Sequence, residues 1–133
     1  MDQGSLVEMQ ITDGKRFVDR LLEEGIPMTA ACWLKETDGG LWYLYLVTPL
    51  IQEGRPRQPA QRRVNAVLRQ MPEPFWIGYG ETKLVGPDSP VGKALEDLYK
   101  RPRPSAVLRS GSSQFGGVEV DAIYPYPPPK APV

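Results

Sequence analysis

The chain has 133 residues, of which 41% are hydrophobic and 24% charged, and these are the length and composition of one globular domain. Its 16 basic and 16 acidic residues give a net charge of zero, unlike the strongly basic chains of dedicated nucleic-acid binders. There is no histidine and Cys32 is the one cysteine, which excludes Cys/His zinc sites and histidine-based catalysis. Carboxylate chemistry, lysine chemistry and oxygen-bound magnesium or calcium remain open, but none has a recognisable motif, so we expect no metal and no other cofactor.

The N-terminal part of the chain predicts one helix. Thr12 or Asp13 can cap it, and its apolar residues recur at helical spacing: Phe17, Val18, Leu21 and Leu22. Gly25, followed by an Ile-Pro pair, predicts the end of this helix, because glycine adopts the left-handed conformation and proline cannot continue a helix. Residues 6–11 either extend the helix or form a short strand.

Residues 29–35 and 41–48 are rich in aromatic and branched side chains and are joined by a polar, glycine-bearing turn. This pattern predicts an antiparallel hairpin. Both faces of the second strand are apolar, with Trp42, Leu44 and Leu46 on one and Tyr43, Tyr45 and Val47 on the other. We therefore expect a central strand that is covered on both sides.

A second helix follows a loop rich in proline and arginine. Its apolar residues again recur at helical spacing: Val64, Val67, Leu68 and Met71. The pattern predicts that this helix begins near Ala60, and that residues 82–85 form an extended strand after it.

The last third of the chain predicts a helix and two strands. Ser89 and Pro90 suit the N-cap and first position of a third helix. Residues 106–108 and 118–124 are strand candidates, and the serine- and glycine-rich stretch 110–117 between them is expected to be a flexible loop.

The predicted order is α-β-β-α-β-α-β-β. It indicates an α+β fold with about three helices packed on a small antiparallel or mixed sheet of about five strands. We expect a single domain over residues 1–124 and a proline-rich tail over residues 125–133. Such a tail cannot join a sheet interior, so it should be polyproline II or disordered, and its removal should hardly change stability.

Charge is distributed unevenly along the chain. Residues 1–54 hold nine acids and four bases (net −5), whereas residues 55–133 hold seven acids and twelve bases (net +5). The candidate partner-binding residues are arginines in the loop before the second helix, on that helix, and after the third helix: Arg55, Arg57, Arg62, Arg63, Arg69, Arg101 and Arg103. Guanidinium groups suit carboxylates and phosphates. The alternatives are that the two halves neutralise one another in the fold, or that the helix face is only solvated.

Other residues have simpler structural interpretations, and we assign none of them a catalytic role. Cys32 lies in an apolar strand and is expected to be a buried hydrophobe. The aromatics of the strand candidates resemble a base-stacking face: Trp33, Trp42, Tyr43, Tyr45, Phe75 and Trp76. Lys35 is the one base in the two hairpin strands, so core packing explains these aromatics better. Residues 110–117 lack the lysine and the following helix of a phosphate-binding loop.

No stretch has the roughly 20 apolar residues that a membrane span needs. Residues 1–8 show no basic segment followed by an apolar run, as a secretory signal would, and a single cysteine fits a reducing compartment. We therefore expect a cytoplasmic protein that does not enter a membrane.

Four short phrases resemble a group of short, uncharacterised bacterial proteins: GIPMTAACW at 25–33, WYLY at 42–45, RVNA at 63–66 and KLVGPDSP at 83–90. The similarity covers most of residues 15–125. It implies a stand-alone bacterial domain and brings no activity or site with it.

These features favour a non-enzymatic interaction protein, a small subunit or adaptor of a larger bacterial assembly that binds another protein through the arginine-rich loop and helix. The first alternative is a nucleic-acid-binding accessory protein that uses the same basic surface. The second is an enzyme that works without histidine. The sequence is also compatible with a homo-oligomer.

Overall fold

The computed structural model describes residues 8–100 and 108–128. Three helices and five strands follow one another in the predicted order, α-β-β-α-β-α-β-β, and the predicted α+β class is confirmed. The helices are α1 (Glu8–Glu23), α2 (Gln58–Gln70) and α3 (Pro90–Tyr99), and a short 3-10 turn, η1 (Tyr79–Glu81), precedes the third strand. The strands are β1 (Ala30–Glu36), β2 (Trp42–Val47), β3 (Thr82–Val85), β4 (Leu108–Phe115) and β5 (Val118–Pro125).

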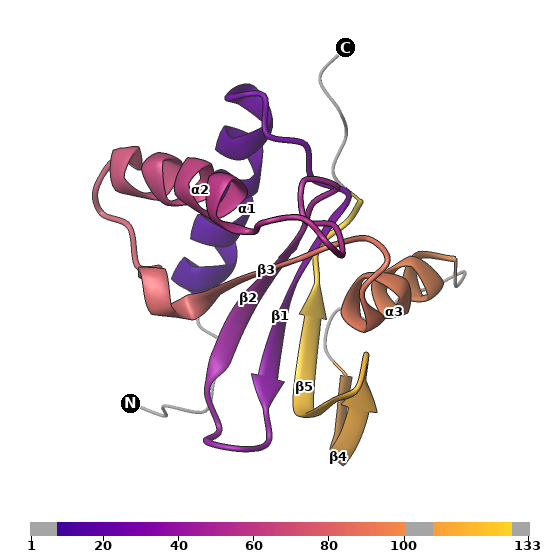
Figure 1. Cartoon of the computed structure of the whole chain (residues 1–133). Coiled ribbons are helices and arrows are strands. Elements are labelled where there is room, and N and C mark those ends of the chain that lie inside the picture. Colours follow the sequence, from indigo (N-terminus) through magenta and orange to yellow (C-terminus); the bar gives the residue numbers. More distant parts are fainter. Residues whose placement is uncertain (1–7, 101–107, 129–133) are drawn as a thin grey trace.

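The five strands form one mixed sheet in the order β3-β2-β1-β5-β4. β1 and β2 make the predicted antiparallel hairpin, with Ala30 opposite Val47 and Lys35 opposite Trp42. β2 and β3 are parallel and are connected through α2, while β5 pairs antiparallel with both β1 and β4. Figure 1 shows α1 and α2 on one side of the sheet and α3 on the other.

Each face of the sheet has its own core. On the α1/α2 side, Phe17 and Val64 pack with Trp33 of β1, and all three are fully buried. On the α3 side, Leu95 packs with Cys32. Helices on both sides explain why both faces of β2 are apolar, as the alternation in the sequence predicted.

Helix ends agree with the sequence in some places and not in others. Ser89 caps α3 as predicted, with its Oγ accepting from the Gly92 N–H at 3.0 Å, and Gly25 follows α1 with a φ of 79°. The predicted cap at Thr12 or Asp13 is wrong, because α1 already begins at Glu8 and Asp13 is buried within it. Helix α2 begins at Gln58, two residues before the predicted start.

The expected flexible loop at 110–117 is wrong for most of its length. β4 continues through Phe115, and a tight turn at Gly116 and Gly117, both with positive φ, leads into β5. Serine and glycine are weak strand formers, but pairing with a neighbouring strand overrides that preference.

The expected end of the sheet at residue 124 is also wrong. Pro125 is the last residue of β5, opposite Cys32, and the Tyr126 N–H donates to the Ala31 carbonyl at 3.0 Å. Proline fits here because β4, as far as the structure describes it, pairs with β5 only up to Ile123, and no described strand on that side takes an N–H from Pro125.

The Tyr126 side chain packs against α1 and forms a hydrogen bond with its backbone. It is 6% exposed. Its hydroxyl donates to the Ile11 carbonyl at 2.6 Å and accepts from the Trp33 Nε1–H at 2.9 Å. A Cβ on Gly14 would lie 2.2 Å from that hydroxyl, so only glycine lets the tyrosine approach the helix this closely. Of the predicted tail, residues 129–133 lie outside the described part.

Candidate functional site

The sequence-predicted arginines within the described residues lie in the loop before α2 and along α2. Arg55, Arg57, Arg62, Arg63 and Arg69 are all exposed. The opposite side of the helix is buried through Ala60, Val64, Val67 and Leu68. The helical spacing therefore places the arginines away from the core. Arg101 and Arg103 lie outside the described residues, so the structure does not place them beside this set.

Two of these arginines form hydrogen bonds with backbone carbonyls of other segments of the domain. The Arg57 guanidinium donates to the carbonyl of Leu84 on β3, which is an edge strand of the sheet. It therefore covers a backbone acceptor that an open edge would expose. Arg63 donates to the Gly25 carbonyl at the end of α1, at 3.5 Å. These two side chains serve the structure at least in part.

Arg55, Arg62 and Arg69 differ from that pair. Within residues 8–100 and 108–128, none of their guanidinium groups forms a hydrogen bond or an ion pair. We call these three residues the arginine surface. No ion pair joins the arginine surface to the acidic N-terminal half. Among the described residues, the ion pair that does join the two halves is Lys83–Glu36, at 2.7 Å.

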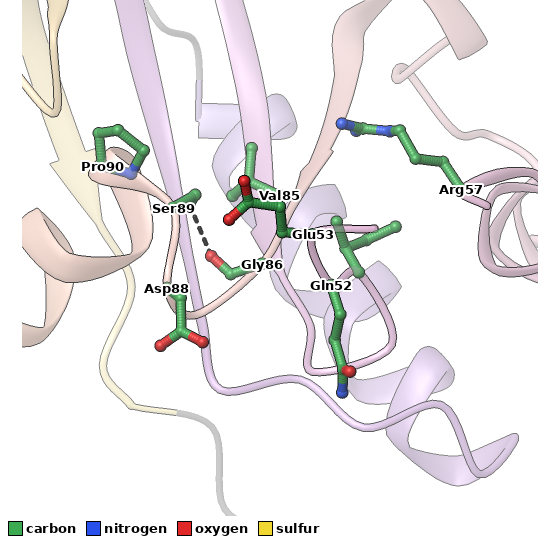
Figure 2. Close-up of a pocket in the computed structure, with 9 residues that line it drawn as sticks. Gln52, Glu53, Arg57, Val85, Gly86, Asp88, Ser89 and Pro90 are labelled. Carbon is green, nitrogen blue, oxygen red and sulfur yellow. Dashed lines mark hydrogen bonds between the residues drawn. The ribbon is translucent and has the colours of Figure 1, made fainter. Parts of the chain in front are cut away.

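A cavity of about 300 Å³ lies next to Arg57, at the carboxyl ends of the parallel strands β2 and β3. Figure 2 shows Arg57 extending toward β3 from one side, with Ser89 and Pro90 bordering the other. Glu53 and Asp88 also line the cavity, and their carboxylates offset the arginine. The Ser89 hydroxyl already donates a hydrogen bond to the Gly86 carbonyl, at 2.5 Å. This mixed lining does not favour an anionic ligand.

A second charged group lies on the α3 side of the sheet. Lys83 is 2.7 Å from Glu36 Oε2 and 4.3 Å from the Tyr43 ring centroid, and the Tyr45 hydroxyl donates to the same Glu36 oxygen at 2.7 Å. Burial raises the pKa of Glu36, but hydrogen bonds from Lys83 and Tyr45 outweigh it and the net pKa is lowered. Burial, and then Glu36, raises the pKa of Tyr45. Neither group exchanges a proton readily near neutral pH.

The remaining reactive groups are equally unsuited to catalysis. Cys32 is fully buried, and burial raises the pKa of its thiol, so the nucleophilic thiolate is not formed near neutral pH. Burial also raises the pKa of Tyr99, to about 12. Within the described part of the chain, no three metal-ligating side chains come together.

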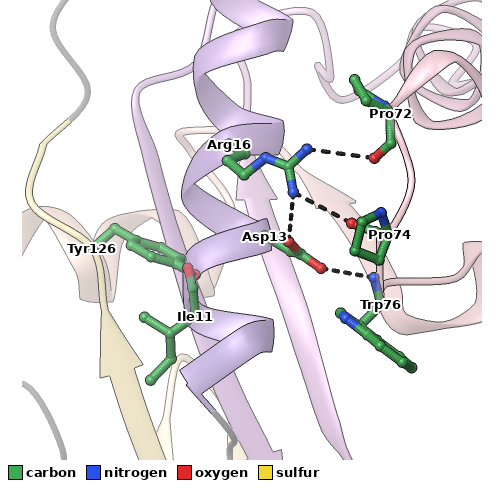
Figure 3. Close-up of polar contacts among 7 residues, drawn as sticks. All are labelled: Ile11, Asp13, Arg16, Pro72, Pro74, Trp76 and Tyr126. Atoms are coloured by element: carbon green, nitrogen blue, oxygen red, sulfur yellow. Dashed lines mark hydrogen bonds and ion pairs between the residues drawn. The ribbon is translucent and has the colours of Figure 1, made fainter.

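Asp13 is the buried charge that the sequence did not predict. Its side chain is 5% exposed and accepts from Arg16 Nη1 at 2.9 Å and from the Trp76 N–H at 2.7 Å. Arg16 also donates to the carbonyls of Pro72 and Pro74, each at 3.4 Å. Figure 3 shows Asp13 and Arg16 facing the segment 72–76, with Tyr126 on the other side of α1. The segment after α2 is therefore fixed to α1 at three points.

Only the Asp13–Arg16 spacing, i and i+3 on one helix, is visible in the sequence. The main partner of Asp13 is 63 residues away, and no local pattern connects the two.

Comparison of the chain with protein-family models, with curated proteins and with solved structures finds no match. Among the helices of the described residues, none has the length and apolar character to cross a membrane.

Proposed function

We propose that this protein is a non-enzymatic interaction protein, a small subunit or adaptor of a larger bacterial assembly in the cytoplasm. Its binding site is the arginine surface, and its partner is a protein with an acidic patch. The observation that carries the proposal is the exposure of Arg55, Arg62 and Arg69 without any acidic or backbone partner among the described residues.

Two properties of the domain support binding over catalysis. Guanidinium groups form paired hydrogen bonds with carboxylates. Burial raises the pKa of the Cys32 thiol and of the Tyr45 hydroxyl, and at Glu36 the hydrogen bonds from Lys83 and Tyr45 outweigh burial and lower the pKa, so all three pKa values move away from neutral pH.

The alternative partner for the same surface is a nucleic acid. Single-stranded binders combine basic residues with exposed aromatic rings that stack on bases. Here Trp33 and Tyr45 are 0% and 4% exposed, and Trp42 and Tyr43 are half-buried. Of the aromatics that resembled a stacking face in the sequence, Trp76 is the exposed one, and a single ring does not form a stacking series for successive bases. This favours the protein partner.

The test reverses the charge of two partner-free arginines. Arg62→Glu/Arg69→Glu leaves the anchored Arg57 and Arg63 in place. Lys93→Glu/Lys100→Glu is the matched control, with the same change of net charge on exposed positions of α3, across the sheet. Each protein is used to capture partners from the native host and to bind DNA and RNA in mobility-shift assays.

We expect the wild-type and control proteins to capture the same acidic protein, and the arginine variant to lose it. None should bind nucleic acid at physiological salt. Nucleic-acid binding by the wild type that falls steeply with salt and is lost in the arginine variant would replace the proposal with the alternative. An arginine variant that keeps every interaction would show that the surface is only solvated.

A further inference from the structure

Trp76 is the most exposed large hydrophobic residue in the described part of the chain. Its side chain is 54% exposed, compared with 53% for Leu41 and 49% for Met9. The other two tryptophans are placed differently, since Trp33 is fully buried and Trp42 is half-buried. An isolated exposed leucine or methionine is ordinary, whereas tryptophan carries the largest apolar surface and is the residue most enriched at binding hot spots.

The backbone that presents Trp76 is fixed. Its own N–H donates to Asp13 at 2.7 Å, and the carbonyls of Pro72 and Pro74 accept from Arg16. The preceding residue, Phe75, is half-buried and packs edge-on against Phe17, with ring centroids 6.0 Å apart. The buried Asp13 carboxylate thus holds a segment whose largest side chain, that of Trp76, remains exposed (Figure 3).

This arrangement suits binding. A tryptophan on an immobilised backbone loses little conformational entropy when a partner covers it. Its exposure also means that the core does not depend on its ring.

Trp76 lies at the same end of α2 as one member of the arginine surface. Arg69 is in the last turn of α2, and the segment that carries Trp76 begins directly after that turn and returns past α1 (Figure 1). A hollow of about 260 Å³ between α1 and this end of α2 is lined by Arg16, Arg20, Met71 and Pro72, together with Asp19 and Glu23. Along the chain, Arg69 and Trp76 therefore flank Met71 and Pro72, which line the hollow. The two arginines of the hollow are matched by Asp19 and Glu23, so the hollow itself adds no net positive charge.

We infer that Trp76 is the apolar anchor of the interface proposed above, and that the partner segment carries an aromatic or large aliphatic side chain among its carboxylates. This inference rests on the proposed function, because the acidic character of the partner comes from the arginine surface. Trp76 therefore adds a second requirement for the partner, an apolar side chain, which the charge of the arginine surface alone does not impose.

Binding to two defined polymers distinguishes the contribution of the arginine charges from the contribution of Trp76. Poly-glutamate offers carboxylates only, and a random glutamate–tyrosine copolymer offers the same charge with aromatic side chains. Binding of both is measured by titration calorimetry at low salt for the wild type, Trp76→Ala, Leu41→Ala and Arg62→Glu/Arg69→Glu. Leu41→Ala is the matched control, because Leu41 is equally exposed but lies in the hairpin turn. Urea unfolding confirms that each variant keeps the fold.

We expect the wild type to bind the copolymer roughly tenfold more tightly than poly-glutamate, the size of a single hot-spot contribution. Trp76→Ala should remove that preference and leave poly-glutamate binding unchanged, and Leu41→Ala should change neither. Arg62→Glu/Arg69→Glu should lose both polymers.

The failures are distinguishable. If poly-glutamate binds and is lost in the arginine variant, but Trp76→Ala keeps the copolymer preference, the anchor is wrong and the arginine surface stands. If neither polymer binds the wild type, the proposed function fails and the anchor fails with it. If sedimentation shows a wild-type dimer that Trp76→Ala converts to a monomer, Trp76 contacts a second copy of this chain, and the inference is overturned.

Discussion

Helices α1 and α2 pack on the same side of the sheet, but their charged side chains behave differently. α1 carries both signs, and its charges pair locally: Lys15 with Asp19, Arg16 with Asp13, and Arg20 with Glu24 just after the helix. α2 carries arginines and no acid. On α2, Arg63 donates to the Gly25 carbonyl, whereas the guanidinium groups of Arg62 and Arg69 form no hydrogen bond or ion pair in the described structure.

This difference indicates what each set of charges does. A helix with both signs at i,i+3 and i,i+4 spacing gains stability from its own pairs. A helix with one sign gains nothing of that kind, and its charges repel one another. Exposed like charges that do not stabilise the fold are therefore the better candidates for binding a partner.

The largest effect we expect comes from removing the chain end that packs against α1, and it replaces the negligible change that the sequence predicted. Removing the chain after Tyr124 deletes Pro125 and Tyr126 and breaks the hydrogen bonds of Tyr126 to Ile11, Trp33 and Ala31. We expect the free energy of unfolding to fall by about 4 kcal/mol, as for other large core aromatics. Urea unfolding followed by circular dichroism measures it.

Tyr126→Ala in the full chain should reproduce most of that loss. Pro128→Ala, at an exposed position, should stay within about 0.5 kcal/mol of the wild type. A truncated protein as stable as the wild type would contradict the packing described for this end of the chain.

The second-largest loss of stability should come from replacing Asp13, the buried carboxylate of α1. Asp13→Ala leaves Arg16 and the Trp76 N–H without their carboxylate, and we expect a loss of about 2 kcal/mol. Asp19→Ala is the control on the same helix. Its pair with Lys15 is exposed on both sides, so its removal should cost well under 1 kcal/mol. Equal losses for the two variants, measured by urea unfolding, would show that burial of Asp13 has no energetic consequence.

A smaller loss of stability is expected from replacing Glu36, a charged residue on the α3 side of the sheet. Glu36→Gln weakens the contacts with Lys83 and Tyr45, and we expect a loss of about 1 kcal/mol at neutral pH. Because the folded pKa of Glu36 is lowered, its contribution is complete above the ordinary glutamate pKa of about 4.3 and is lost as pH falls through the folded pKa. The wild-type and variant stability curves should therefore converge on acidification from pH 6 to roughly pH 3. Curves that stay parallel would exclude this linkage.

Much of the fold could be predicted from local sequence patterns. The alternation in the hairpin, the helical spacing of Val64, Val67 and Leu68, and the Ser89-Pro90 cap each depend on residues close together in the chain. The strand through 108–115 and the packing of Tyr126 could not be predicted, because both depend on partners elsewhere in the fold. Composition alone suggested a loop and a loose tail.

The candidate site was predictable to a similar extent. The exposure of Arg62 and Arg69 follows from their position relative to the apolar stripe of α2. The engagement of Arg57 by Leu84 and of Arg63 by Gly25 depends on segments that only the fold brings near. For the same reason the sequence could not separate anchored arginines from those free of partners.

The central claim, that Arg62 and Arg69 serve binding and not the fold, is tested most directly by measuring stability and partner capture on the same preparation of Arg62→Glu/Arg69→Glu. We predict a free energy of unfolding within about 0.5 kcal/mol of the wild type together with loss of the acidic partner that Lys93→Glu/Lys100→Glu retains. A loss of stability of more than about 1.5 kcal/mol, which only a structural role would cause, or unchanged capture of the partner, would contradict it.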